Sequence, residues 1–529
     1  MEPTGLHTAT TNPRDTVSSR SARANAPASA ALVAYDGAQS HETVGEFVSE
    51  SNLEALNATL SAELGTIVKE RVDSGHCPSI FARVFQGERV LFEAGTGEYA
   101  PGAGLPGPDT AYRIASCSKS FTAATLLVLR ERGQLNLDAP ITDFVPEFTL
   151  SATGRNFPAP SVRMLMSMSG GLPTDDPWAD RQESISNAEL RAITANGVLL
   201  TTAPGTAFQY SNLGYALLGQ VIEAVTGRAF RDVAREEILE PLGLADTGYE
   251  QTVVPARRLA IGHRKGPGGW IELPLTGPGA FSCIGGLFSS ARDLSAWVRW
   301  LASAVSETPD ASGPLSVAAR REMQQVATPI LEVAAMTTSP RHVERHFGYG
   351  FGLISEVDAR LGQFVSHSGG YPGFSSHMRW HAPTSLGVVT FENATYSGAA
   401  RTATDLIDRV LEDVGFALGS AEPWAMTREL AQEANALLYG WDDERAARIF
   451  EENVALDEPF AERQRLIEGL VDEVGGLRGS PSEPIVVQAS DAPLFARWNV
   501  AGHRGGLVCE VRLSPKTPSL IQTFTIQTA

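Results

Sequence analysis

The chain has 529 residues, of which 43% are hydrophobic and 19% are charged. At about 100–200 residues per domain, this length predicts two to four domains, and the composition excludes a globally disordered chain. Acidic residues outnumber basic ones by 61 to 42, which gives a formal net charge of −19. Because so acidic a surface repels phosphate backbones and anionic lipid, we expect neither a nucleic-acid partner nor a membrane partner.

The cysteines and the amino-terminal region indicate a cellular compartment. Four cysteines lie far apart, with no C-x-x-C pair: Cys77, Cys117, Cys283 and Cys509. This spacing predicts neither a disulfide framework nor a zinc knuckle and favours a reducing compartment. The apolar stretch over 30–35 is shorter than the roughly 7–15 residues of a signal-peptide core. We therefore expect a cytoplasmic protein.

Residues 1–45 are rich in Ser, Thr and Ala without apolar periodicity, and we expect them to form a flexible leader. A helix is predicted over 52–72, followed by a strand pair over 79–95 that turns near Gly87. Further helices are predicted over 118–132, stopped by Gly133, and over 212–225, stopped by Gly227.

Strand-like runs return later in the chain, at 348–354, 364–366, 377–381 and 386–392. Early strands, a helical middle and late strands predict an α+β fold. In it, both ends of the segment 46–418 close one antiparallel sheet around an all-helical subdomain.

The character of the sequence changes near residue 420. Helices are predicted at 427–439, after Asp442 and after Pro459, and strands are predicted at 485–488, 494–500, 507–513 and 520–526. We expect residues 419–529 to form a small accessory α+β domain. It is expected to pack against the catalytic domain or a second copy of the chain, or alternatively to cover the active-site mouth.

The first candidate for chemistry is the sequence Ser116-Cys117-Ser118-Lys119, which reads S-x-x-K and opens a predicted helix. Positions i and i+3 share one helix face, so the Lys119 ammonium can reach the Ser116 hydroxyl. A serine becomes a useful nucleophile only when a base takes its proton. The alternative is a serine three residues before a surface lysine, but only four lysines occur in the chain. Cys117 points about 100° away from that face and is expected to be a small buried residue.

The second candidate, Tyr210-Ser211-Asn212, precedes the next apolar helix. A tyrosine acts as a base near neutral pH only when a neighbouring cation lowers its pKa, and Lys119 is the cation we expect. Asn212 offers a donor and an acceptor for substrate and lysine, although it could also serve simply as a helix cap.

The third candidate is His367-Ser368-Gly369-Gly370 at the end of a predicted strand. Glycines there allow the backbone to approach a substrate closely. The N–H groups of Gly370 and Ser116 together would form an oxyanion hole, with Ser368 and Gly369 in contact with substrate. On its own, a histidine before two glycines is usually a turn residue.

In this order, the three motifs resemble those of the serine β-lactamase and penicillin-binding-protein superfamily. The similarity is to its class C β-lactamase-like group of esterases, D-amino-acid peptidases and transacylases. Three further segments contribute to the resemblance: 162–173 (VRMLMSMSGGLP), 285–294 (GGLFSSARDL) and 349–353 (YGFGL). It spans roughly residues 55–400.

The resemblance implies that Ser116 attacks a carbonyl to form an acyl-enzyme and that Lys119 and Tyr210 move its proton. It also implies that Asn212 lines the site and that no cofactor or metal is needed. His367 stands where many relatives carry the lysine of K-T-G. Because a histidine is largely neutral at pH 7, we expect esters or amides without a carboxylate to be preferred over β-lactams.

Other chemistries find less support in the sequence. His342 and His346 read H-x-E-x-H instead of the zinc motif H-E-x-x-H, and no G-x-S-x-G elbow or P-loop occurs. The tripeptide Lys516-Thr517-Pro518 mimics K-T-G, but it lies outside the resembling region and its proline lacks an N–H.

Three functional classes follow from the motifs. The first is a hydrolase that acts on a small ester or amide through an acyl-enzyme. The second is a cytoplasmic acyltransferase or cyclase of small-molecule biosynthesis that uses the same intermediate. The third is a non-catalytic binding protein, which intact polar motifs disfavour.

Overall fold

A computed structural model of the chain describes residues 56–152, 154–306, 308–331, 345–416, 422–488 and 492–529. The predicted leader, 1–45, lies outside these residues, as does His342. Within the described ranges, no helix has the length and apolar character needed to cross a bilayer.

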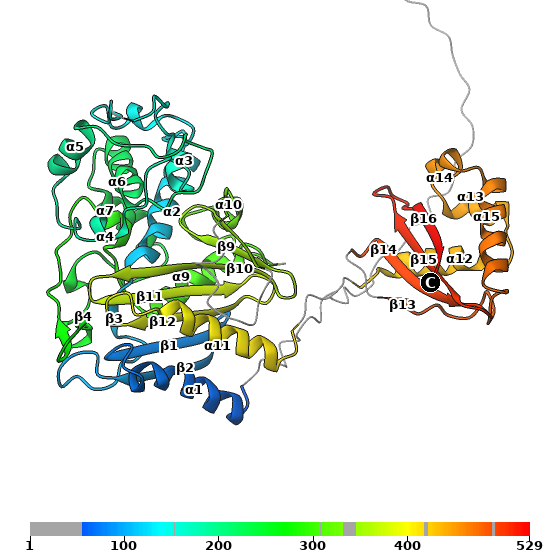
Figure 1. Cartoon of the computed structure of the whole chain (residues 1–529), viewed down its shortest axis with the longest axis horizontal. Helices are drawn as coiled ribbons and strands as arrows, with labels where there is room; N and C mark the ends of the chain where they lie inside the picture. Colours follow the sequence, from blue (N-terminus) through cyan, green and yellow to red (C-terminus); the bar gives the residue numbers. More distant parts are fainter. Residues whose placement is uncertain (1–55, 153, 307, 332–344, 417–421, 489–491) are drawn as a thin grey trace, which may run out of the picture. The chain divides into compact units, whose positions relative to one another are not determined.

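An eight-stranded antiparallel sheet, in the order β2-β1-β12-β11-β10-β9-β8-β7, forms the centre of residues 56–416 (Figure 1). Its strands are β1 (Ser79–Gln86), β2 (Arg89–Gly97), β7 (Thr328–Ile330), β8 (Arg345–Tyr349), β9 (Ile354–Asp358), β10 (Gly362–Tyr371), β11 (Phe374–His381) and β12 (Leu386–Glu392). Because β1 pairs with β12, early and late strands close one sheet, as predicted.

One predicted strand, over 348–354, is wrong. The chain leaves β8 at Tyr349, turns, and returns as β9 from Ile354. The turn is closed by a hydrogen bond from Gly350 N to Leu353 O, and Gly352 takes a left-handed φ of 69°. The glycines of this segment therefore make a hairpin instead of extending a strand.

A hydrophobic core covers each face of the sheet, and the side chains of β1 point alternately into the two cores. Ile80 and Val84 pack into a core with α1 (Ala58–Asp73) and α11 (Ala399–Asp413). The intervening Phe81 belongs to the larger core on the other face, with α2 (Ser118–Glu131) and α9 (Ala291–Ser303).

The first helix begins later than predicted. Asn57 caps it, since its side-chain oxygen accepts a hydrogen bond from Leu60 N at 2.8 Å, and the helix starts at Ala58. Residues 52–55 of the predicted range lie outside the described residues.

Between the early and late strands lies the helical region seen above the sheet in Figure 1. It contains α3 (Val162–Met166), α4 (Asp176–Ala179), α5 (Asn187–Ala195), α6 (Asn212–Thr226), α7 (Phe230–Ala234) and α8 (Ser282–Gly285). The same stretch carries two short strand pairs, β3 (Ala111–Arg113) with β6 (Phe288–Ser290) and β4 (His263–Gly266) with β5 (Gly269–Glu272); α10 (Val317–Gln324) follows α9. The predicted α+β class, an antiparallel sheet flanked by helices with a helical subdomain, is confirmed.

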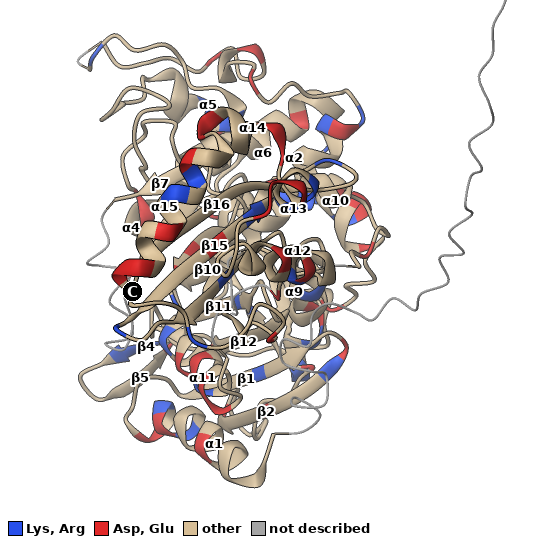
Figure 2. Ribbon diagram, turned by 90° about the vertical axis from the view of Figure 1, so that its right-hand side faces the viewer, with Lys and Arg blue, Asp and Glu red and all other residues tan. Residues whose placement is uncertain are grey.

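Residues 422–529 have a hydrophobic core of their own, centred on residues such as Trp498 and Phe524. They form four helices, α12 (Ala425–Ala436), α13 (Asp443–Ile449), α14 (Glu452–Asp457) and α15 (Phe460–Glu473), and a sheet of β13 (Val487–Gln488), β14 (Phe495–Ala501), β15 (Gly506–Leu513) and β16 (Ile521–Thr528). Asp442 caps α13 as predicted, whereas α14 had no predicted counterpart. Figure 2 shows acidic and basic residues interspersed along α15.

Candidate active site

Ser116 lies in a short 3-10 turn, Ala115–Cys117, immediately before α2. Ala115 takes a left-handed φ of 48°, and every residue from Ser118 to Leu129 is buried. The Ser116 side chain lines a cavity of about 360 Å³, although the residue is only 8% exposed. Ser116 is therefore fixed at the N-terminal end of a central helix, where free N–H groups and the helix dipole favour negative charge.

Lys119 contacts Ser116 directly. Its Nζ lies 3.0 Å from Ser116 Oγ and donates to the carbonyl of Ile284 at 2.9 Å. The side chain is fully buried, and this burial lowers the pKa of Lys119 to about 8. Asp176, Asp180 and Asp175 act in the opposite direction and keep the pKa from falling further. At mildly alkaline pH, Lys119 is therefore uncharged to a substantial extent and able to accept a proton.

Tyr210 joins Ser116 in the same cavity. Lys119 Nζ lies 5.1 Å from the centre of the Tyr210 ring. The pKa of Tyr210 is raised well above its usual value, mainly because protein surrounds the hydroxyl and secondly because Asp176 is close, while a hydrogen bond with the Ser116 side chain opposes the shift. The prediction that Lys119 lowers this pKa is therefore wrong. Desolvation outweighs the nearby cation, and Tyr210 stays protonated at neutral pH.

Asn212 is the first residue of α6 and is fully buried. Its amide Nδ2 donates to Asp176 Oδ1 at 2.5 Å, and its backbone N donates to Asp175 Oδ1 at 2.7 Å. Asn212 is not among the residues that line the cavity, whereas Asp176 is. The hydrogen bond from Asn212 at the start of α6 therefore holds the Asp176 side chain at the cavity wall.

His367 lies on β10 and is held by two hydrogen bonds. Its Nδ1 is 2.7 Å from the carbonyl of Ser368, and its Nε2 is 3.0 Å from the Tyr349 hydroxyl. Because a carbonyl only accepts, Nδ1 carries the proton and Nε2 accepts from Tyr349. Burial, followed by the nearby Lys119, lowers the pKa of His367 to about 3. The ring is therefore neutral and supplies no positive charge to the cavity.

Ser368, Gly369 and Gly370 also line the cavity. A Cβ added to Gly369 would stand 2.2 Å from the carbonyl oxygen of Ile114, and one added to Gly370 would stand 2.3 Å from the Tyr396 ring. Neither position has room for a side chain. Gly369 thus lets β10 run close to the turn that carries Ser116, and Gly370 leaves room for the Tyr396 ring.

Tyr396 was not predicted, yet it forms part of the cavity wall. It lies in the loop after β12 with a left-handed φ of 47°, and its hydroxyl donates to the Asp180 carboxylate. Burial raises the pKa of Asp180 to about 6, so this group remains largely ionised above neutral pH. Nothing in the sequence around Tyr396 distinguishes it from an ordinary loop residue.

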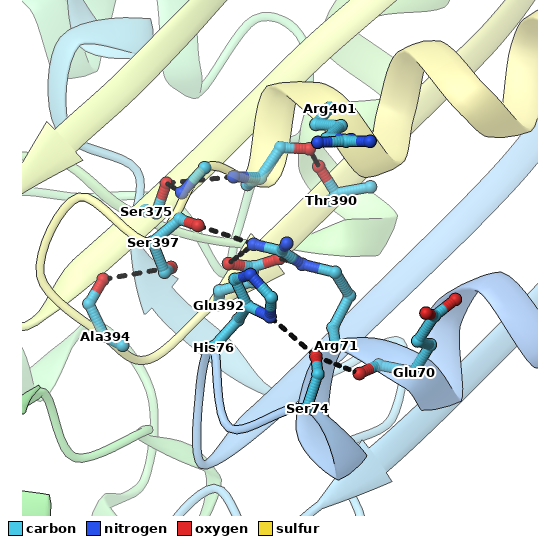
Figure 3. A network of polar contacts seen from close by, with 12 residues as sticks. Glu70, Arg71, Ser74, His76, Ser375, Thr390, Glu392, Ala394, Ser397 and Arg401 are labelled. Atoms are coloured by element: carbon cyan, nitrogen blue, oxygen red, sulfur yellow. Dashed lines mark hydrogen bonds and ion pairs between the residues drawn. The ribbon is translucent and has the colours of Figure 1, made fainter. Parts of the chain in front are cut away.

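A buried ion pair anchors that loop (Figure 3). The Arg71 guanidinium pairs with Glu392, with Nε 2.8 Å from Oε1, and donates to the carbonyl of Ser397 at 2.5 Å. On the other side, the Ser375 hydroxyl accepts from the amides of Gly398 and Ala399 at 3.3 and 3.2 Å. The loop that carries Tyr396 is therefore fixed at both ends.

Asp176 is the second functional candidate that the motifs missed. The run Asp175-Asp176-Pro177 carries a usable signal, because acidic residues before a proline are typical of a helix start. In the structure, α4 does begin at Asp176.

The remaining candidates have structural roles or lie apart from the cavity. Cys117 is fully buried, as predicted; its Sγ contacts the His367 carbonyl at 3.2 Å, and burial raises its pKa to about 12. Within the described ranges, no group of three or more His, Cys, Asp or Glu residues is placed to hold a metal ion.

Comparisons with known proteins agree with this geometry. Protein flp of Staphylococcus aureus is 26% identical over 339 residues, which are 63% of this chain and 62% of that protein. The chain thus spans about three fifths of the length of this relative. The unguisins hydrolase ungD′ of Aspergillus campestris is 25% identical over 376 residues, covering 68% of this chain and 67% of its own.

A solved structure of a D-stereospecific amidohydrolase from a Streptomyces species has the same fold, with a TM-score of 0.52 and 23% identity over 65% of this chain and 97% of that one. The family model named Beta-lactamase matches residues 64–412, about two thirds of the chain and all of the elements that build the cavity. The chain therefore belongs to the beta-lactamase family.

Proposed function

We propose that this protein is a serine hydrolase that acts on a small ester or amide through a covalent acyl-enzyme. The observation that carries the proposal is the 3.0 Å contact between Lys119 Nζ and Ser116 Oγ at the wall of the cavity. A buried lysine whose pKa lies near 8 is a base matched to a serine nucleophile at physiological pH.

In the first step, uncharged Lys119 takes the Ser116 proton while Oγ bonds to the substrate carbonyl carbon. The N–H groups of Ser116 and Gly370 would hold the resulting oxyanion. The bond to the leaving group then breaks, and the leaving atom receives a proton from Lys119 through the Tyr210 hydroxyl. Tyr210 is suited to relay this proton because its raised pKa keeps it protonated.

In the second step, a water molecule attacks the acyl-enzyme. Its proton passes to Lys119, the acid product leaves, and Ser116 recovers its proton. The same intermediate supports acyl transfer when an amine or alcohol takes the place of water. Incubation of an acyl donor with and without amine acceptors, read by mass spectrometry, distinguishes the two reactions. If amides form from the amine acceptors in aqueous solution, the proposed reaction becomes acyl transfer instead of hydrolysis.

The substrate class follows from the neutral His367. A substrate carboxylate would find no cation at this position, because the pKa of His367 lies near 3. We therefore expect esters and amides without a carboxylate to react faster than β-lactams, which carry one. Turnover of nitrocefin comparable with that of a p-nitrophenyl ester would contradict this preference.

Names of similar proteins support the general reaction. The Aspergillus relative is called a hydrolase and the Streptomyces structure an amidohydrolase. Both names describe hydrolysis, the general class of reaction proposed for this cavity.

The test is intact-mass detection of an acyl group on Ser116 across esters, thioesters, D-amino-acid amides and β-lactams. Ser116→Ala should abolish the mass increase. Ser118→Ala is the matched control, because this neighbouring serine points to Leu287 N, its hydroxyl accepting at 3.2 Å, and should leave acylation intact. No adduct on wild-type protein with any substrate or with a fluorophosphonate would favour a non-catalytic binding protein instead.

A further inference from the structure

The charge of the cavity distinguishes one class of substrate. Thirteen residues form its wall, among them Ser116, Asp176, Tyr210 and His367. Among these residues, Asp176 is the one with a formal charge, since His367 is neutral. The surface that meets the substrate is therefore negative.

The catalytic state makes this imbalance larger. Lys119 accepts a proton only when it is uncharged, and in that state the nearby carboxylates of Asp175, Asp176 and Asp180 lose their cation. Asp175 is occupied with the amides of Asn212 and Leu213, at 2.7 and 2.8 Å.

The other two carboxylates differ in what already occupies them. Asp180 accepts from the Tyr396 hydroxyl. Asp176 accepts from the Asn212 amide through Oδ1, and within the described ranges no donor reaches its Oδ2. Asp176 is thus the carboxylate available to a ligand. An ammonium group carries three donors and no acceptor, which matches the free carboxylate oxygen of Asp176 on the cavity wall.

We propose that Asp176 selects acyl donors that carry an ammonium group a few bonds from the scissile carbonyl. The inference rests on the proposed function, because Asp176 and Ser116 line the same cavity of about 360 Å³. An ion pair with the half-buried Asp176 carboxylate at this cavity wall is stronger than one in water. The bound ammonium also replaces the positive charge that Lys119 gives up when it becomes the base.

The experiment compares matched p-nitroanilides. Alanine, β-alanine and 4-aminobutyrate anilides place the ammonium one, two and three carbons from the carbonyl. In the isobutyryl, butyryl and pentanoyl anilides a methyl group replaces the ammonium. We expect wild-type kcat/KM for at least one amine to exceed that of its methyl analogue by tenfold or more, mainly through KM.

Asp176→Asn keeps the shape of the side chain and its contact with Asn212 but removes the charge. The advantage of the amine over the methyl analogue should disappear in this variant. An equal loss for both substrates would assign Asp176 a positioning role toward Asn212 and Lys119 and would overturn the proposal. Measurements on the pH plateau above the Lys119 pKa separate substrate selection from any change in that pKa.

A second measurement needs no variant. Butylammonium should inhibit wild-type turnover of p-nitrophenyl acetate competitively, and butyrate at the same concentration should not. If the methyl analogues are turned over, but the amines have no advantage and butylammonium does not inhibit, only this inference is refuted. If no substrate acylates Ser116, the proposed function itself fails.

Discussion

Lys119 and Lys516 are two of the four lysines of the chain, and their environments are opposite. Lys119 is fully buried, and burial lowers its pKa to about 8. The Lys516 side chain is 68% exposed, its Nζ lies 2.7 Å from Glu451 Oε2, and this contact raises its pKa. Desolvation makes Lys119 a base, whereas the carboxylate partner keeps Lys516 positively charged.

This difference also separates two similar sequence motifs. Lys516-Thr517-Pro518 imitates the K-T-G of many relatives, but its lysine is paired with Glu451 within residues 422–529. The environment of each lysine, more than the letters around it, therefore indicates which one can take part in proton transfer.

The sharpest test of the comparison removes each amine in turn. Lys119→Gln should lower kcat/KM for p-nitrophenyl acetate by about 10²–10⁴-fold, the range typical of a lost general base. Lys516→Gln should change it by no more than about twofold, because a surface ion pair contributes little. Steady-state kinetics with equal amounts of folded protein, verified by circular dichroism, measure both. A Lys119→Gln variant with near wild-type activity would show that another group is the base.

Tyr210→Phe is expected to have the next largest effect. It keeps the ring beside Lys119 but removes the hydroxyl that bonds to Ser116, so kcat should fall about a hundredfold with little change in KM. Tyr215→Phe is the matched control. Its ring centre is also near Lys119 Nζ, at 5.7 Å, but its hydroxyl donates to the Met166 carbonyl at 2.8 Å.

The control should therefore lower thermal stability and largely spare kcat. If the two variants lose kcat equally, Tyr210 has no special part in proton transfer.

The pH profile tests the charge on Lys119 directly. Protonated Lys119 cannot accept a proton, so kcat/KM should fall tenfold per unit below a midpoint near pH 8 and level off above it. Asp180 raises the Lys119 pKa, so Asp180→Asn should move the midpoint to lower pH, by about half to one unit. Asparagine can still accept from Tyr396. Asp138→Asn, at an exposed carboxylate paired with Arg163, should leave the midpoint unchanged. A shift of the Asp180→Asn midpoint to higher pH would contradict the electrostatic assignment.

Local geometry explains which parts of the site the sequence predicts. Ser116 and Lys119 are three residues apart at a helix start, so their contact follows from helix geometry alone. Tyr210 and His367 could be selected only by their motifs, because their approach to Ser116 depends on the packing of distant elements. The direction of the Tyr210 pKa was mispredicted for the same reason: desolvation depends on residues that the local sequence does not identify.

The positions of Asp176 and Tyr396 at the cavity wall could not be predicted from the sequence. Asp176 reaches the cavity because the α4 start packs against the first turn of α6, through the hydrogen bond from Asn212. Tyr396 reaches it because the loop after β12 is fixed by Arg71 and Ser375, which come from other elements of the chain. The antiparallel sheet was easier to predict, since apolar alternation and glycine turns are local signals.

The smallest expected effect concerns residues 422–529, which contain Lys516, and it tests whether the activity that depends on Lys119 needs them. Residues 422–529 have their own hydrophobic core, and the cores around the sheet contain none of these residues. A chain that ends before Glu422 should therefore fold, and its kcat/KM for p-nitrophenyl acetate should stay within about twofold of the full chain. The informative measurement is the ratio of kcat/KM between small and bulky esters, because steric exclusion acts on size and leaves Lys119 unchanged. A ratio that moves toward bulky esters on truncation would mean that this domain covers the active-site mouth. An unchanged ratio would confine substrate selection to the cavity around Ser116.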